Sequence, residues 1–141
     1  MIEMVSKNHA IVKEGTYKKI KFTICFLRGG YYTCYLDVTK TSLYSVDYKD
    51  IDLPVYWGLT YSDYKYPWEK DKDFNKYIIG WDYAHFDDAL EYDMCKLIFG
   101  DGYFEHRFMG HNHHTIRELT LECIKAIDSI YEKEMNIYET M

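Results

Sequence analysis

The clearest pattern along the chain is an alternation of apolar and polar side chains over residues 17–28. The apolar side chains occupy even positions: Ile20, Phe22, Ile24 and Phe26. A period of two is typical of a strand with one buried face. After Gly29-Gly30 the even positions are apolar again, at Tyr32, Cys34, Leu36 and Val38. Residues 17–28 and 31–38 therefore predict a β-hairpin.

The parity of the two segments predicts the length of the hairpin loop. A two-residue loop pairs an even position with an odd one and places the apolar faces on opposite sides of the sheet, whereas a three-residue loop aligns them. We expect the three-residue turn, with Phe26 opposite Cys34. Cys25 then points to the other face, which disfavours a Cys25–Cys34 disulfide.

Later segments are expected to extend the sheet. Residues 39–54 are polar and predict a long ordered loop, and strands are expected at 55–61 and 76–83. Residues 62–75, with a proline and alternating charges, predict a surface connection. Residues 87–99 predict a short helix that ends at Gly100, with these side chains facing inward: Ala89, Leu90, Met94, Leu97 and Ile98.

The last segment has the strongest helical pattern. Thr115 and Glu118 form a capping box, which predicts the start of a helix. Apolar residues follow at intervals of three and four: Ile116, Leu119, Cys123, Ile124, Ile127, Ile130 and Tyr131. We expect an amphipathic helix of about 20 residues that ends near Met135. The chain is therefore predicted to be one α+β domain over residues 1–141, an antiparallel sheet covered by this helix.

Composition and charge narrow the function. The chain has 141 residues, a net charge of −6 and four cysteines. The acidic balance argues against binding along a nucleic-acid backbone, which needs a basic stripe. The cysteines form no Cys-x-x-Cys pair, so buried reduced thiols are expected instead of a zinc ribbon. With no membrane-length apolar run and no signal-peptide pattern in residues 1–10, the chain is predicted to be cytosolic.

Tyrosine is in large excess, with 16 in the chain. Base composition is one cause, because Tyr, Lys, Ile, Asn and Phe share codons poor in G and C, and lysine far outnumbers arginine. The physical consequence is the same in either case. The chain carries many amphipathic rings that stack, pack and offer a hydroxyl group.

Two strand-like segments combine a tryptophan with a glycine, Trp57-Gly58 and Gly80-Trp81. A glycine inside a strand often marks the close approach of a ligand or of another backbone. If the segments are neighbours, their rings form a wall suited to a planar heterocycle. The rings are Tyr56, Trp57, Trp81 and Tyr83, and the polar anchors are Thr60, Asp82 and His85. The alternative is that these rings belong to the core and the glycines relieve crowding.

A series of short motifs runs in order between residues 30 and 131. They are Gly30-Tyr31, Tyr48-Lys-Asp-Ile51, Gly58-Leu-Thr-Tyr61 and Gly80-Trp-Asp-Tyr-Ala-His-Phe-Asp-Asp88, followed by the last helix. Their order and spacing resemble a group of small phage-encoded proteins. This chain departs from the pattern of that group at four places. Where the group has His-Gly, His-Pro, Gly and Phe, this chain has Tyr56-Trp57, Thr41-Ser42, Ser45 and Trp81, respectively. With no histidine at position 56, a catalytic or metal role shared by two histidines is weakened.

The resemblance implies a viral origin and a compact domain, and it transfers no established chemistry. Small non-structural phage proteins often counter host defences. They either occlude a defence protein or capture its nucleotide signal. The resemblance therefore makes both activities expectations for this chain.

Two polar clusters offer other chemistry. Three carboxylates and one imidazole over residues 82–88, namely Asp82, His85, Asp87 and Asp88, could hold a divalent cation or act as general base and orienting group. The imidazoles of His106 and of residues 111–114 could bind Zn or Ni with Asp101 or Glu105. Alternatively, the 111–114 loop is pH-sensitive, or contacts an anion together with Arg117 and the helix N-terminus.

Three hypotheses follow. The favoured one is a phage counter-defence protein in the host cytoplasm that sequesters a small nucleotide-type signal without turnover, with no catalytic residue, cofactor or metal. Its ligand-binding residues would be Tyr56, Trp57, Thr60, Trp81, Asp82, Tyr83, His85 and Arg117. The second is an anti-CRISPR-like inhibitor that blocks a host defence protein through tyrosines and the acidic loop 47–52. The third is a metal-dependent hydrolase built on Asp82, His85 and the 111–114 loop.

The first hypothesis is favoured because paired glycine–aromatic segments explain a concave site better than a flat one. A homodimer is also expected. A single sheet covered by one helix leaves its other face to be buried, and the remaining tyrosines would lie on that face.

Overall fold

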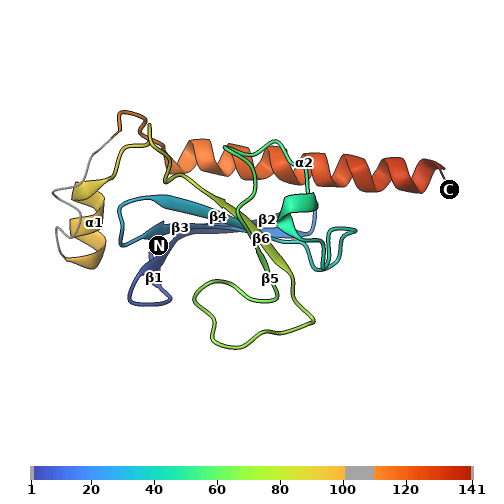
Figure 1. Cartoon of the computed structure of the whole chain (residues 1–141), viewed down its shortest axis with the longest axis horizontal. Coiled ribbons are helices and arrows are strands. Elements are labelled where there is room, and N and C mark those ends of the chain that lie inside the picture. The colour runs from blue at the N-terminus through green and yellow to red at the C-terminus, as the bar shows by residue number, and fades with distance from the viewer. Residues whose placement is uncertain (1, 101–109, 141) are drawn as a thin grey trace.

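An antiparallel sheet and a long helix form the two main layers of the molecule (Figure 1). The computed structural model describes residues 2–100 and 110–140. The strands are β1 (Glu3–Met4), β2 (His9–Tyr17), β3 (Ile20–Leu27), β4 (Tyr32–Asp37), β5 (Tyr61–Asp63) and β6 (Ile78–Asp82), in the order β1-β2-β3-β4-β6-β5. The helices are a 3-10 turn, η1 (Tyr48–Asp50), and two α-helices, α1 (Tyr92–Phe99) and α2 (Ile116–Thr140). The expected α+β class is confirmed.

The β3–β4 hairpin has the expected aligned faces but a different register. Its loop holds three residues, 28–30, and the N–H of Leu27 donates to the carbonyl of Tyr31 at 2.9 Å. Phe26 therefore lies opposite Tyr32, whereas we expected Cys34. The turn is centred on Gly29 because Gly30, at φ 89°, closes it by donating to the carbonyl of Leu27. All four cysteines are buried and free.

One face of the sheet packs against α2. The helix presents Leu119, Cys123, Ala126, Ile127 and Ile130 to the even-numbered side chains of β3 and β4. The hydroxyl of Thr115 accepts a hydrogen bond from the N–H of Glu118 at 3.1 Å, so the expected N-terminal cap is confirmed. Among the described residues, no helix is both long and apolar enough to cross a membrane.

The other face of the sheet is covered by the chain itself. Tyr66 and Trp68, from the segment after β5, stack at 4.8 Å, and both meet the ring of Tyr35 edge-on. Figure 1 shows this segment on the opposite side of the sheet from α2. The expected surface connection is therefore part of a second small core. The reason for expecting a homodimer, an uncovered face, does not hold in this fold.

Three other sequence expectations need correction. Strand β2 was not expected, because a bulge between Ile11 and Lys13 breaks its period of two. Strand β1 was not expected either, because its two residues are too few to show a period. Residues 55–60 form a turn instead of a strand, with positive φ angles of 59° at Trp57 and 79° at Gly58. Helix α1 begins five residues later than expected, at Tyr92.

Four of the five side chains expected to face inward do so, since Ala89 is buried and Leu90, Met94 and Ile98 pack against the main core. The exception is Leu97, which is 83% exposed, while Cys95 is the buried residue of this helix. The later start explains the difference, because Ala89 and Leu90 precede the helix and do not set its phase. The helix ends as expected at Gly100, which has the left-handed conformation of a C-terminal cap.

Gly80 gives a test of how tightly the second face is packed. A Cβ at this position would lie 2.6 Å from Cδ1 of Tyr35 and 2.8 Å from the carbonyl oxygen of Cys34. We expect Gly80→Ala to lower the free energy of unfolding by about 1–3 kcal/mol, measured by urea denaturation. Gly58→Ala is the control, since its Cβ meets nothing within 4 Å and only its φ of 79° is unfavourable. Gly80 has no positive φ, so a loss of less than about 1 kcal/mol in Gly80→Ala would contradict steric crowding there.

Candidate functional site

The carboxylate of Asp88 is the centre of the site. Its side chain is fully buried and accepts four hydrogen bonds. At Oδ1 it accepts from the Tyr56 hydroxyl and from Nε2 of His114, each at 2.7 Å. At Oδ2 it accepts from the backbone N–H of His85 at 2.9 Å and from Nδ1 of His85 at 3.2 Å. Both oxygens are therefore fully engaged.

These donors decide the charge of the carboxylate. Burial alone would raise the pKa of Asp88. The hydrogen bonds from His114, from the amide of His85 and from Tyr56 outweigh burial and hold the pKa below its usual range. Burial and the neighbouring carboxylate raise the pKa of Tyr56 in turn, so its hydroxyl stays protonated and donates. Asp88 is a buried anion with a complete set of donors.

A short backbone pairing brings the segment before α2 to Asp88. The N–H of Ala89 donates to the carbonyl of Asn112 at 2.9 Å, and the N–H of Asn112 donates to the carbonyl of Asp87 at 2.8 Å. Gly110 is required beside them, because a Cβ there would lie 2.3 Å from the carbonyl carbon of Asp87. The pairing places His114, at the start of α2, against the carboxylate.

Two ring pairs stack on this network. Tyr56 lies parallel to Tyr83 at 5.0 Å, and Trp57 lies parallel to His85 at 4.4 Å. The backbone N–H of Tyr56 also donates to Oε1 of Glu122 on α2 at 2.5 Å. Trp57 remains 64% exposed. The site is thus an exposed indole on a rigid base of buried rings and charges.

Asp82 lies on the other side of His85. It accepts from the Thr60 hydroxyl at 3.0 Å and from the N–H of Ala84 at 3.1 Å. Its Oδ1 is 3.8 Å from Nε2 of His85. Thr60 and Asp82 border a cavity of about 350 Å³, and His85 borders another of about 270 Å³.

The structure divides the expected ligand-binding residues into three groups. Tyr56, Trp57 and His85 come together, with Thr60 and Asp82 beside them. Trp81 and Tyr83 lie in the core, 1% and 2% exposed, with the indole N–H donating to the Tyr83 hydroxyl. They present almost no surface to a ligand. Gly80 likewise accommodates Tyr35, so the crowding alternative describes this segment.

Arg117 does not join the site. It is exposed on the first turn of α2, and no hydrogen bond or ion pair links it to the described residues of the site. The reason is helical phase. The neighbouring Leu119 faces the sheet, which turns Arg117 toward solvent.

The described residues give no support to the hypotheses of a metal site. Within residues 2–100 and 110–140 there is no group of three His, Cys, Asp or Glu side chains arranged to hold a metal ion. His113 pairs with Glu91 at 2.7 Å, and His114 with Asp88. The other candidate ligands, Asp101, Glu105 and His106, lie outside the described residues.

Two members of the network were not expected in these roles. The sequence places His114 in a candidate metal-binding loop and assigns no role to Glu122. No pattern in the sequence signals the His114 contact, because its partner Asp88 lies 26 positions away. Glu122 gives no signal either, because its partner is a backbone N–H.

Comparison of the chain with protein-family models, with curated proteins and with solved structures finds no match. The function is therefore argued from the geometry of the site.

Replacing Asp88 tests the network. Asp88→Asn puts an amide among donors, and we expect a loss of about 3 kcal/mol in the free energy of unfolding at pH 7 by urea denaturation. The exposed neighbour Asp87 gives the control, with Asp87→Asn changing stability by less than about 0.5 kcal/mol. A loss that is equal in the two variants would contradict the central role of Asp88.

The same pair of proteins gives a pH test. Because the folded pKa of Asp88 is lowered, its charge stabilises the fold fully above the unfolded pKa of about 4, and this contribution is lost as pH falls through the folded pKa. The difference in unfolding free energy between the wild type and Asp88→Asn should therefore be largest near pH 7 and should shrink below pH 4. A difference that stays constant down to pH 2.5 would show that the charge is not responsible.

Proposed function

We propose that this chain is a binding protein that captures a planar, nucleotide-type small molecule on Trp57 without turning it over. The observation that carries the proposal is the exposed Trp57–His85 stack, 4.4 Å between ring centres, on a base fixed by Asp88. Stacking of a base on an aromatic side chain contributes about 1–3 kcal/mol and tolerates many bases. A ligand of this class suits the platform.

The backbone at Trp57 supports a functional role for the ring. A φ of 59° is unfavourable for a bulky residue, at a cost of about 1 kcal/mol or more. The exposed indole recovers little of this by burial, being 64% exposed. A solvent-facing tryptophan in a strained turn is better explained by contact with a ligand than by folding.

Binding without turnover is supported by the state of the polar groups. Both oxygens of Asp88 accept hydrogen bonds that fix its neighbours, and Nδ1 of His85 is directed at Asp88. Tyr56 occupies the position at which the resembling proteins have a histidine. These groups are committed to holding the site together, which suits a rigid receptor more than a general base.

The resemblance to small phage-encoded proteins supports the wider role. We propose that the captured molecule is a nucleotide signal of a host defence, bound in the host cytoplasm. Sequestration needs affinity and a stoichiometric amount of protein, and a preorganised aromatic platform supplies affinity at little entropic cost.

A second candidate function rests on a different observation. Phe86, which follows His85 in the chain, is 78% exposed, so it is a second large aromatic side chain that reaches solvent, besides the Trp57 that stacks on His85. Exposed aromatics of this kind are typical of the energetic centre of a protein interface. In this alternative the chain blocks a host defence protein directly, with the Trp57–Phe86 surface at the contact.

The experiment for the first function is capture of cyclic and linear nucleotides by purified protein, followed by heat release and chromatography of the released ligand. We expect the ligand to return unaltered. Trp57→Ala should weaken binding at least tenfold because the platform is lost, with little change in thermal unfolding. Phe74→Ala is the matched control, since Phe74 is another exposed aromatic residue, at 66%.

The outcomes separate the alternatives. If the released nucleotide is chemically altered, the protein is an enzyme and the proposal of binding without turnover is wrong. If no nucleotide is captured, while a host protein co-purifies at equal stoichiometry and is lost in both Trp57→Ala and Phe86→Ala, the direct inhibitor is supported. Nucleotide binding that is unchanged in Trp57→Ala would exclude the platform.

A further inference from the structure

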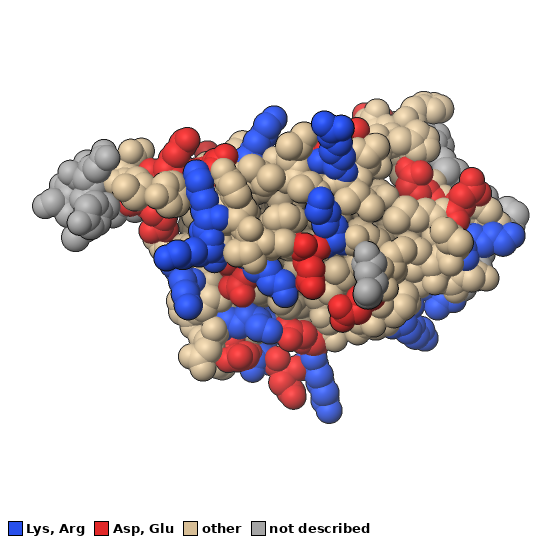
Figure 2. Space-filling view, turned by 180° about the vertical axis from the view of Figure 1, so that it is seen from behind, with Lys and Arg blue, Asp and Glu red and all other residues tan. Residues whose placement is uncertain are grey.

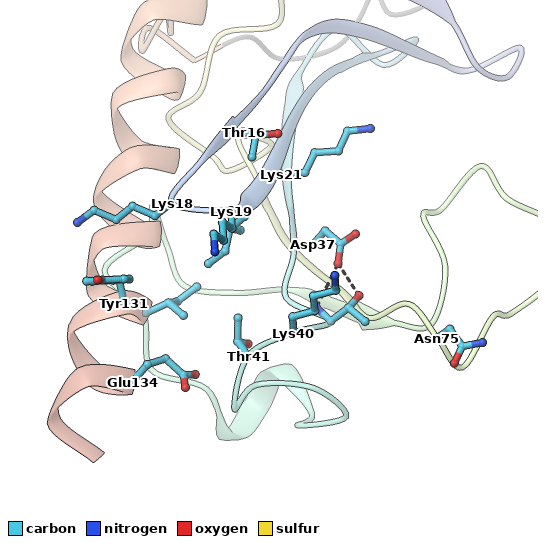
Figure 3. Close-up of a pocket in the computed structure, with 13 residues that line it drawn as sticks. Thr16, Lys18, Lys19, Lys21, Asp37, Lys40, Thr41, Asn75, Tyr131 and Glu134 are labelled. Atoms are coloured by element: carbon cyan, nitrogen blue, oxygen red, sulfur yellow. Dashed lines mark hydrogen bonds between the residues drawn. The ribbon is translucent and has the colours of Figure 1, made fainter. Parts of the chain in front are cut away.

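Another cavity, of about 530 Å³, opens between the β2–β3 turn, the segment after β4 and the C-terminal half of α2 (Figure 3). Four lysines line it, Lys18, Lys19, Lys21 and Lys40, against two carboxylates, Asp37 and Glu134. It is remote from Trp57. Tyr131 borders it, nine positions along α2 from the Glu122 that contacts the Trp57 turn, or about 14 Å along the helix.

The carboxylates of this cavity are already engaged by neutral donors. Oδ1 of Asp37 accepts from the N–H of Thr39 at 3.1 Å and from its hydroxyl at 2.5 Å. Oε1 of Glu134 accepts from the N–H of Ser42 at 2.6 Å. Neither carboxylate forms an ion pair with a lysine of the cavity in the described part of the chain.

The lysines differ in their partners. Nζ of Lys18 is 2.7 Å from Asp128 and lies over the ring of Tyr131, and Nζ of Lys21 is 3.4 Å from Glu14. Lys19 and Lys40 are both exposed, and neither has an ion pair within residues 2–100 and 110–140. Figure 3 shows them on two separate segments that border the cavity, Lys19 on the β2–β3 turn and Lys40 on the segment after β4. Two ammonium groups therefore border one cavity, and neither forms an ion pair in the part of the chain that the structure describes.

The position of Lys19 is unfavourable for the fold by itself. Tyr17 pairs with Ile20, so the hairpin turn consists of Lys18 and Lys19 alone, with φ angles of 48° and 66°. Two-residue turns with positive φ at both positions favour Asn and Gly, and two adjacent like charges repel each other. A turn of this kind that carries two lysines suggests a use for their charge.

The surrounding charge makes this cluster distinctive. The whole chain carries −6, which repels anions at long range. On the face seen in Figure 2, Lys and Arg side chains lie among Asp and Glu side chains, and some of the basic ones lie toward the end of the molecule at which α2 finishes. A cavity lined by four lysines and two carboxylates on an acidic chain suits a compact anion more than a long nucleic-acid backbone.

We propose that this cavity binds the phosphate groups of a polyphosphate anion, inorganic or attached to a nucleoside, through Lys19 and Lys40. Ammonium groups bind phosphate as point charges, and several of them around one cavity suit a ligand with several charged oxygens. The site is separate from the Trp57 platform, and its occupation does not depend on the function proposed for that platform.

Isothermal titration of the full chain with inorganic tripolyphosphate at low ionic strength tests the proposal. We expect Lys19→Gly and Lys40→Gln each to weaken binding by about tenfold, and added salt to weaken it further. Lys125→Gln is the matched control, because Lys125 is an exposed lysine of α2 outside the cavity. It should change the affinity less than twofold.

Lys19→Gly also separates binding from folding. Glycine suits the positive φ at this position, so the variant should unfold at a higher temperature than the wild type while binding tripolyphosphate more weakly. Opposite changes in the two measurements support a direct contact. A nucleoside triphosphate that binds within tenfold of tripolyphosphate supports recognition through phosphate.

Several results would overturn the proposal. They are the absence of tripolyphosphate binding by the wild type, an equal loss in Lys125→Gln, and loss of binding in Trp57→Ala. If the nucleoside triphosphate binds and tripolyphosphate does not, the protein recognises the nucleoside and not the phosphate groups. Tighter binding of a short DNA duplex, lost in the same lysine variants, would show that the cavity is part of a nucleic-acid surface.

Discussion

Strands β4 and β6 are buried on both faces, and the rest of the fold depends on this constraint. Leu36 and Ile79 face α2, while Tyr35 and Ile78 face the other way, and all four are almost inaccessible to solvent. A sheet with two apolar faces needs two covers. Helix α2 supplies one, and the segment that carries Tyr66 and Trp68 supplies the other, so the chain closes both faces without a partner.

A buried carboxylate organises the end of this sheet. Burying an anion is unfavourable unless donors surround it, so the position of Asp88 requires Tyr56, His85 and His114 to meet there. These residues come from three separated segments. Their convergence fixes the turn that carries Trp57, and the same interaction that stabilises this corner therefore presents an indole ring to solvent on a rigid support.

The tyrosine excess has a structural explanation beyond base composition. Tyr32 and Tyr83 belong to the core under α2, and Tyr35 and Tyr66 to the core on the other face. Several hydroxyls donate hydrogen bonds to backbone carbonyls of the loops. The hydroxyl of Tyr77 donates to the carbonyl of Val46 at 2.5 Å, within the long segment between β4 and β5. The rings fill space while their hydroxyls satisfy backbone groups, which phenylalanine could not do.

The local sequence pattern predicted the elements that have a regular apolar period or that depend on contacts between residues close in the chain. A period of two predicts the β3–β4 hairpin and its aligned apolar faces. A period of 3.6 predicts helix α2, and Thr115 marks its start because its hydroxyl caps the N–H of Glu118. Strand β2 was missed because a bulge breaks its period, and residues 55–60 were mistaken for a strand because an apolar run does not reveal a positive φ.

The sequence by itself determined the α+β class, the parity of the hairpin and the start of the long helix. Only the tertiary structure decided that Trp81 is buried while Trp57 is exposed, although each has a glycine beside it. It also decided that His114 meets Asp88, 26 positions away. The physical reason is that burial and the pairing of charges depend on which distant segment covers a residue, and periodicity carries no information about that.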